Sequence, residues 1–279
     1  MGIGMRAGVV AVSLLATGGL QAQTSQAARH VVDTMLVHVG NASEHSNLYM
    51  YVSEERSART GGHLWTERVA ETSVGKVRLL VAEDGQPLNT ERAAAEKARL
   101  AEIAAHPDAF HQRELAVKSD EEHAQQMVVL LQKAFLFDEP RVQGEDLRIA
   151  FRPDPAYQTQ SLEERVLHGM SGSILVDARA MELHRIEGRL PADVSIGFGL
   201  LGTIRAGSSF STTHAPEPGN EWKTSTVDTE IDGKLLFFKS IGKKEQVVHR
   251  DFKLLASDVS VPQAVTMLEN SPELLASSH

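Results

Sequence analysis

The glycines at positions 197, 199 and 202 form the pattern in this chain that comes nearest to a known chemical motif. The segment Gly197-Phe198-Gly199-Leu200-Leu201-Gly202 has the G-x-G-x-x-G spacing with which backbone N–H groups at a helix N-terminus hold a pyrophosphate. The next residues, 203–209, read Thr-Ile-Arg-Ala-Gly-Ser-Ser, which favours a strand or a loop over a helix. Because the motif needs a helix N-terminus to bind phosphate, we predict no dinucleotide cofactor.

Other patterns that resemble catalytic motifs also lack the context that their chemistry needs. Gly169-Met170-Ser171-Gly172-Ser173 resembles a nucleophile elbow, but its fifth residue is not glycine and a strand is expected after it. His106 and His111 are five residues apart across a proline, which is not the spacing of helical metal ligands. Pairs of acidic residues are adjacent in sequence, so their side chains point apart. We predict a non-enzymatic protein without a metal site, with a hydrolase built from residues that meet only in the fold as an alternative.

The segment 196–204 is unusually apolar for a connection between strands. Phe198, Leu200 and Leu201 are separated by glycines, which give the backbone conformational freedom. An exposed apolar segment usually packs or binds something. We therefore name these three residues as candidate ligand-binding residues at the mouth of an apolar pocket. The alternative is that they plug one end of the core.

Residues 1–22 have the layout of a secretory signal peptide. Arg6 is followed by an apolar run from Ala7 to Ala16, and the segment ends on the small residue Ala22. The apolar run is shorter than the roughly 20 residues that span a bilayer. The chain contains no cysteine, so we expect neither lipid attachment nor disulfides. These features predict a periplasmic or secreted protein that is soluble after cleavage.

Composition narrows the class of partner. The formal net charge is −9, so a polyanion gains little from this surface and nucleic acid is excluded as an expected partner. Hydrophobic residues make up 42% of the chain, which is enough for a real core. The absence of cysteine also excludes thiolate catalysis and cysteine-ligated zinc.

Periodicity predicts three long helices. The first runs from a cap at Thr24-Ser25 to about Val39, with one apolar stripe formed by Ala28, Val31, Val32, Met35 and Val39. The second starts at Asn89 and ends at Pro107 as a surface helix. The third is expected to open at Ser119 with a capping box. Its stripe includes Met127, Leu131 and Phe135, which we name as further candidate ligand-binding residues. A short helix is also expected near residues 262–268.

Alternating apolar residues predict an otherwise β-rich chain. The expected strands are 48–56, 63–72, 76–82, 147–151, 173–177, 181–190, 208–214, 222–231, 234–241 and 245–255. Asp84-Gly85 and Asp232-Gly233 are turn signals, and the second is the strongest hairpin signal in the chain. Short connections favour antiparallel neighbours, and the absence of βαβ units argues against a parallel sheet. We expect a signal peptide (1–22), one β-rich domain (23–255) and a weakly patterned tail (256–279).

The C-terminal half resembles a family of exported proteins. Gly172-Ser173-Ile174-Leu175-Val176-Asp177 followed by Met181–Gly188 is similar to a hairpin of the outer-membrane lipoprotein carrier (LolA-like) superfamily. The segments 197–202, 232–239 and 249–253 continue the same order, whereas Lys223-Thr224 after Trp222 depart from it. The resemblance covers roughly residues 31–255. It implies an α+β fold with a curved, half-open antiparallel sheet wrapped around amphipathic helices, whose concave face holds acyl chains in carriers.

Two functional hypotheses follow from these observations. The first is an exported binding protein for a lipid or lipoprotein acyl chain in the cell envelope. The second is a regulatory or assembly protein that uses the curved sheet to dock an envelope protein. A large apolar cavity is needed by the first hypothesis and is not needed by the second.

The signal-peptide interpretation predicts a mature N-terminus at Gln23. N-terminal sequencing of protein from the envelope fraction of a strain with active signal peptidase measures this directly. Intact Met1 on that protein would contradict the prediction.

Overall fold

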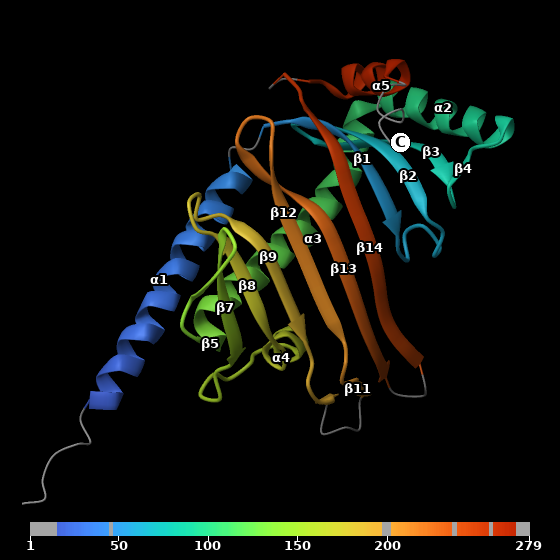
Figure 1. Cartoon of the computed structure of the whole chain (residues 1–279). Coiled ribbons are helices and arrows are strands. Elements are labelled where there is room, and N and C mark those ends of the chain that lie inside the picture. The colour runs from blue at the N-terminus through green and yellow to red at the C-terminus, as the bar shows by residue number, and fades with distance from the viewer. Residues whose placement is uncertain (1–15, 45–46, 197–201, 236–238, 257–258, 272–279) are drawn as a thin grey trace, which may run out of the picture.

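The computed structural model describes residues 16–44, 47–196, 202–235, 239–256 and 259–271 (Figure 1). The helices are α1 (Ala16–Glu44), α2 (Thr90–Ala105), α3 (Pro107–Ala134), α4 (Leu162–His168) and α5 (Val261–Asn270). The strands of the N-terminal half are β1 (Tyr49–Arg56), β2 (Trp65–Thr72), β3 (Gly75–Glu83), β4 (Gln86–Pro87), β5 (Phe135–Phe137) and β6 (Arg141–Gln143). Those of the C-terminal half are β7 (Asp146–Pro153), β8 (Ser171–Asp177), β9 (Leu183–Arg189), β10 (Val194–Ile196), β11 (Gly202–Ile204), β12 (Ser209–Glu217), β13 (Glu221–Leu235) and β14 (Lys239–Leu254).

The described strands form one open antiparallel sheet of 14 strands. This confirms the predicted α+β class with an antiparallel sheet. The main path runs β4-β3-β2-β1-β14-β13-β12-β9-β8-β7-β5, with β6 paired to β7 and the β10–β11 hairpin attached to β13. All consecutive pairs are antiparallel, and the pairing of β1 with β14 joins the two ends of the chain. The sheet has two separate edges, so it is not a closed barrel.

Several predicted elements of the N-terminal half are confirmed. The predicted strands 48–56, 63–72 and 76–82 correspond to β1, β2 and β3. The turn between β3 and β4 contains Asp84 and Gly85, both with positive φ. Asn89 caps α2 by accepting a hydrogen bond from the Arg92 N–H at 2.8 Å. α2 is a surface helix on its charged side only, because Leu100 and Ile103 are buried in the core.

The predicted start of the third helix at Ser119 is wrong. α3 begins twelve residues earlier, at Pro107, and is separated from α2 by His106 alone. Proline ends α2 because it cannot continue the hydrogen-bond ladder, yet at the first position of α3 its missing N–H is not needed. Residues 109–118 are mostly good helix formers, so no break precedes the apparent capping box.

The predicted hairpin at Asp232-Gly233 is also wrong. β13 passes through both residues, and the predicted strands 234–241 and 245–255 fall on the end of β13 and on β14. Gly233 pairs with Ile204 of β11 on one side and with Ile241 of β14 on the other. A residue with partners on both sides is held extended, so local turn propensity is overridden by the sheet.

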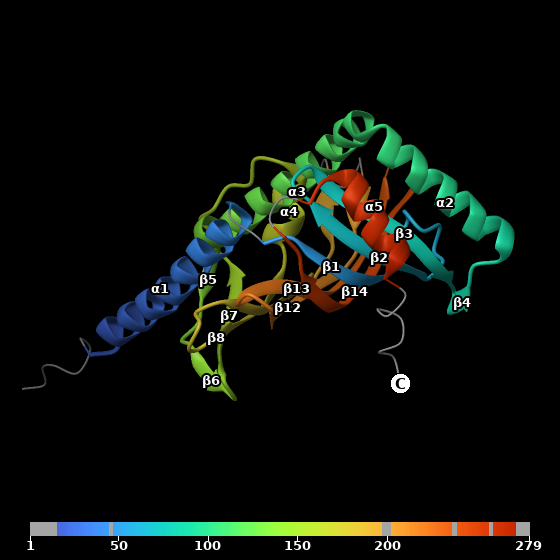
Figure 2. The ribbon, with the colours of Figure 1, turned by 90° about the horizontal axis from the view of Figure 1, so that it is seen from above.

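Directly paired residues of neighbouring strands lie on the same face of a sheet, and the register therefore defines two faces. The row Ile174–Ile186–Thr212–Val227–Val247 belongs to what we call the α3 face. The row Glu187–Ser211–Asp228–Gln246 belongs to the opposite face, which we call the α5 face. Seen from above, α1 and α3 lie on one side of the central strands (Figure 2).

The core is divided between the two faces. On the α3 face, buried residues of α1 and α3 pack on β5 and β7–β9: Ala28, Val32, Met35, Leu130, Leu131, Ala134, Phe135, Phe137, Ile149, Phe151, Ile174, Val176 and Leu183. On the α5 face, α2, α5 and the first turn of α3 pack on β1–β3: Met50, Val52, Ala70, Val77, Leu79, Leu100, Ile103, Phe110, Val259, Val261, Ala264, Val265 and Leu268. The predicted short helix near 262–268 is thus confirmed as α5 and belongs to the core.

The predicted apolar stripe of the first helix is confirmed, but its predicted bounds are wrong. α1 runs from Ala16 to Glu44, beyond the predicted cap at Thr24-Ser25 and the predicted end near Val39. Ala28, Val32 and Met35 are fully buried, and Val31 and Val39 pack at the margin of the same core. α1 begins at Ala16, so the predicted cleavage point after Ala22 lies within the helix and before these contacts. Among the described residues, no helix combines the length and apolar character needed to cross a membrane.

The packing of α3 predicts a large cost for truncating Leu131. This side chain is 3% exposed, so Leu131→Ala should lower the free energy of unfolding by about 2–5 kcal/mol. Leu115→Ala on the same helix is the matched control, because Leu115 is 43% exposed and should change stability little. Urea denaturation measures both variants, and equal effects would show that the α3 stripe is not core.

Candidate functional site

The central strands are covered less completely than the margins of the sheet. β1 has six buried residues among its eight, whereas no residue of β12 is fully buried. On the α3 face, Phe210, Thr212 and Val227 are only half-buried, although α3 crosses behind the central strands (Figure 1). The α3 face of β12–β14 is therefore the surface where a bound molecule could find space.

The structure places the predicted ligand-binding residues in three different situations. Leu131 and Phe135 lie in the packed core between α3 and the sheet, where Phe135 makes an edge contact with Phe151 at 5.3 Å between ring centroids. Met127 lies in α3, but its side chain is outside the described part of the structure. Phe198, Leu200 and Leu201 also lie outside the described residues. Leu131 and Phe135 would thus support one end of a ligand surface rather than stand open in it.

The two segments that resemble catalytic motifs each lead into a strand in the structure. Gly202 opens β11, not a helix, so the glycine motif has no helix N-terminus to offer a phosphate. Ser171 opens β8, not the strand-to-helix turn of a nucleophile elbow. Both segments therefore continue into strands, as the sequence predicted.

Three histidines lie on the central strands β9, β12 and β14. His184 on β9 contacts both oxygens of Asp146, with its Nδ1 at 2.9 and 3.0 Å. Continuing the β9–β12 register places His214 opposite His184, and His214 pairs directly with Thr224. The Thr224 carbonyl accepts a hydrogen bond from Nδ1 of His249 at 3.1 Å. The histidines thus form a row across β9, β12 and β14.

Burial decides the charge of two of these histidines. Loss of solvent, and then the nearby His184, lowers the pKa of His214 to about 4. Burial likewise lowers the pKa of His249 to about 4, and its ring packs on Tyr51 at 4.9 Å. Both imidazoles are therefore neutral at pH 7. The Nδ1 atom of His214 is buried and has no hydrogen-bond partner.

The sequence did not reveal this row, because its members are 30 and 35 residues apart. Alternation with Thr212 and Val247 could have assigned His214 and His249 to the apolar side of their own strands. Bringing them together requires the strand order β9-β12-β13-β14, which no local pattern encodes.

A second polar group on the α3 face is an internal ion-pair network at the β1–β2 connection. Arg59 donates to Glu55 Oε2 at 2.5 Å and to Glu67 Oε2 at 2.6 Å, and its guanidinium lies over the ring of Trp65. Burial alone would raise the pKa of Glu55, but hydrogen bonds from Arg59 and Ser57 hold that pKa below its usual value. The charges of Arg59, Glu55 and Glu67 are paired with one another, so this network stabilises the β1–β2 connection rather than offering an open binding site.

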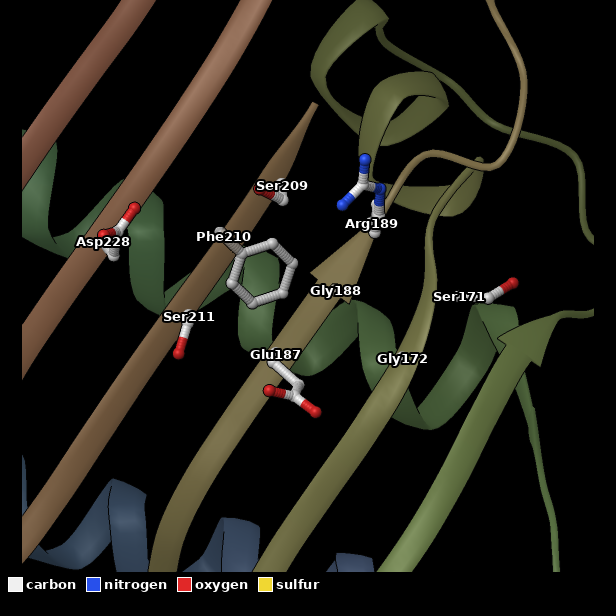
Figure 3. Close-up of a pocket in the computed structure, with 9 residues that line it drawn as sticks. All are labelled: Ser171, Gly172, Glu187, Gly188, Arg189, Ser209, Phe210, Ser211 and Asp228. Atoms are coloured by element: carbon white, nitrogen blue, oxygen red, sulfur yellow. The ribbon is translucent and has the colours of Figure 1, made fainter. Parts of the chain in front are cut away.

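The α5 face carries an open, polar pocket of about 330 Å³ in the middle of the sheet (Figure 3). Its floor is the backbone of Gly172, Gly188 and Phe210, and its walls are side chains of Ser171, Glu187, Arg189, Ser209, Ser211 and Asp228. A Cβ at Gly188 would lie 2.5 Å from Cε1 of Phe210, whose ring covers this glycine from the α3 face. The missing side chain is therefore required by packing behind the pocket.

No group of three or more His, Asp or Glu side chains is arranged to hold a metal ion among the described residues. Comparison with models of known protein families, with curated proteins and with solved structures finds no match. The functional argument therefore depends on the sheet, its two faces and the side chains described above.

The buried histidines predict a loss of stability in mild acid. A histidine whose pKa is lowered in the folded state stabilises the fold above its unfolded pKa of about 6.5, and this contribution is lost as the pH falls towards 4. Between pH 7 and 5 we expect a loss of about 1–2 kcal/mol for each of His214 and His249. Urea denaturation at the two pH values should show a smaller loss in the double variant His214→Gln/His249→Gln.

His63→Gln is the control for this prediction. His63 is exposed and pairs with Asp84, which raises its pKa, so its contribution to stability grows as the pH falls. Removing it should make the acid-induced loss slightly larger. Identical pH dependence in the wild type and the double variant would show that His214 and His249 are not buried neutral groups.

Proposed function

We propose that the protein is an exported, non-enzymatic binding protein that holds an acyl chain of a lipid or lipoprotein between α3 and the central strands. The observation that carries the proposal is the incomplete burial of the α3 face of β12, where α3 crosses behind the central strands (Figure 1). The signal-peptide pattern and the resemblance to lipoprotein carriers support the same function.

The length of α3 gives a physical reason for space at the centre. Its 28 residues correspond to about 42 Å of helix. Near its start, Glu114 accepts a hydrogen bond from the Lys76 N–H of β3 at 3.0 Å, and its last residue, Ala134, leads directly into β5. We propose that the sheet curves around this helix. A straight helix that touches both margins of a curved sheet stands away from its centre.

The chemistry of the central α3 face suits a chain that is apolar along most of its length. Phe210 packs with Leu190, Ile204 and Ile231 at the lower end, and Val247 is buried nearby. At the upper end His214 and His249 are neutral at pH 7, so these two side chains impose no charge on the proposed ligand surface. An acyl chain would lie over the apolar part, with its polar end towards the histidines.

Two neighbouring threonines of β12 provide a matched test. Thr212 is on the α3 face and Thr213 is on the α5 face, and both are half-buried. Thr212→Trp should fill the proposed space and reduce binding of a fluorescent fatty-acyl probe at least tenfold. Thr213→Trp should leave probe binding within about twofold of the wild type. Urea denaturation of both variants separates blocked binding from unfolding.

Mass spectrometry of organic extracts from protein purified out of its native envelope tests the same proposal without a variant. We expect a co-purifying lipid or acylated peptide. If the wild type releases no lipid and binds no probe, the acyl-binding proposal is wrong, and the docking of an envelope protein on the sheet replaces it.

A further inference from the structure

The polar pocket on the α5 face has a charge pattern that the proposed acyl-binding function does not use. Two adjacent rows of the sheet form it. One row is Ser171–Arg189–Ser209 and the next is Glu187–Ser211–Asp228. Figure 3 shows Arg189 and Glu187 extending from β9, with Asp228 beyond Ser211 on the other side. The sites on the two faces are separated by the sheet, so either can exist without the other.

The first row is suited to a carboxylate. The guanidinium of Arg189 forms no hydrogen bond or ion pair with another described residue. Its two cross-strand neighbours, Ser171 and Ser209, are half-buried serines whose hydroxyl groups likewise have no described side-chain partner. A guanidinium between two hydroxyl donors can bind both oxygens of a carboxylate.

The second row is suited to an ammonium group. Glu187 and Asp228 lie one strand to either side of Ser211, so a cation above this small residue is about 5 Å from the strand of each acid. Glu187 Oε1 accepts a hydrogen bond from the Ser173 hydroxyl at 3.0 Å, which leaves its other oxygen for a cation. Glu187 also contacts Arg185 at 3.0 Å, but both groups of that pair are more than 40% exposed and the pair is weak. Asp228 has only a long contact, 3.4 Å, from Gln246.

The distance between the two rows sets the size of the ligand. Ser209 and Ser211 are two residues apart on one strand, which separates the rows by about 7 Å. Between them the floor is flat, because Gly188 has no side chain and the Phe210 ring lies on the opposite face. The pocket contains two carboxylates and one guanidinium, so its net charge is negative. A ligand that carries only a carboxylate is therefore disfavoured, and a ligand that also carries an ammonium group is favoured.

We propose that this pocket binds a small zwitterion of the ω-amino-acid or dipeptide class, with its carboxylate on Arg189 and its ammonium group between Glu187 and Asp228. The charges of the ligand are about 7 Å apart. It lies along β12 with its middle over the backbone of Phe210 and Gly188. The volume of about 330 Å³ accommodates a molecule of this size.

The probe for the test is 6-aminohexanoate, whose amine and carboxylate are separated by five methylene groups. The full-length protein is titrated with 6-aminohexanoate at low ionic strength, and binding is followed by ¹⁵N–¹H chemical shifts. We expect saturable shift changes in β9 and β12. Hexanoate lacks the amine and hexylamine lacks the carboxylate. Each should bind at least tenfold more weakly than the zwitterion.

Variants assign the two ends of the ligand. Arg189→Gln should weaken the binding of 6-aminohexanoate at least tenfold. Asp228→Asn should make 6-aminohexanoate bind no more tightly than hexanoate. Arg148→Gln is the matched control, because Arg148 is an exposed arginine on the same face, paired with Leu175 outside the pocket. It should leave binding unchanged.

Three results would overturn the proposal: no saturable shift in β9 and β12, equal binding of hexanoate and 6-aminohexanoate, or equal effects of Arg189→Gln and Arg148→Gln. Binding of the fatty-acyl probe is measured on the same variants. Because Arg189 and Asp228 lie on the α5 face, acyl binding should persist in them, so failure of one site is distinguished from failure of the other.

Discussion

The antiparallel pairing of β1 with β14 is the constraint on which the rest of the structure depends. It joins Tyr49–Arg56 to a strand that ends nearly 200 residues later, and so makes one sheet from two halves of the chain. Without it, the core of β1–β3 with α2 and α5 and the core of β7–β9 with α1 would be linked only by α3, whose Phe110 belongs to the first core and whose Leu131 belongs to the second. The two cores lie on opposite faces, and the shared sheet fixes how α3 runs from one to the other.

The separation of the cores explains why the central strands look different from the margins. On the α5 face, β8, β9, β12 and β13 present serines, threonines and charged residues to solvent, among them Glu187 and Asp228. On the α3 face the same strands carry Ile186, Thr212 and Val227, which face a helix. Side chains alternate in the centre between the register shifts at Leu175/Val176 and Thr213/His214, and there one face is solvated and the other is partly covered.

Local chemistry predicted the elements well and their assembly less well. The Asp84-Gly85 turn, the Asn89 cap and the stripe around Val32 depend on residues close in sequence, and the structure contains all three. The predicted hairpin at Gly233 and the predicted helix start at Ser119 were both wrong because a local signal was overridden. At Gly233 the override came from paired strands distant in sequence, and at Ser119 it came from a helix that had already begun at Pro107. Of the candidate site, the sequence indicated Leu131 and Phe135 as inward-facing, but it could not indicate the histidine row or the polar pocket. Both require the order in which strands pair.

Gly188 connects the two proposed sites physically. Its backbone is part of the floor of the polar pocket, and the space where its side chain would be is taken by the Phe210 ring on the α3 face. Phe210 in turn packs with the apolar residues at the lower end of that face. A sheet only one backbone thick can therefore present a charged surface and an apolar surface at the same position, provided that successive side chains alternate without error. The register of β9 against β12 is what maintains this alternation, and a slip of one residue would exchange the two faces.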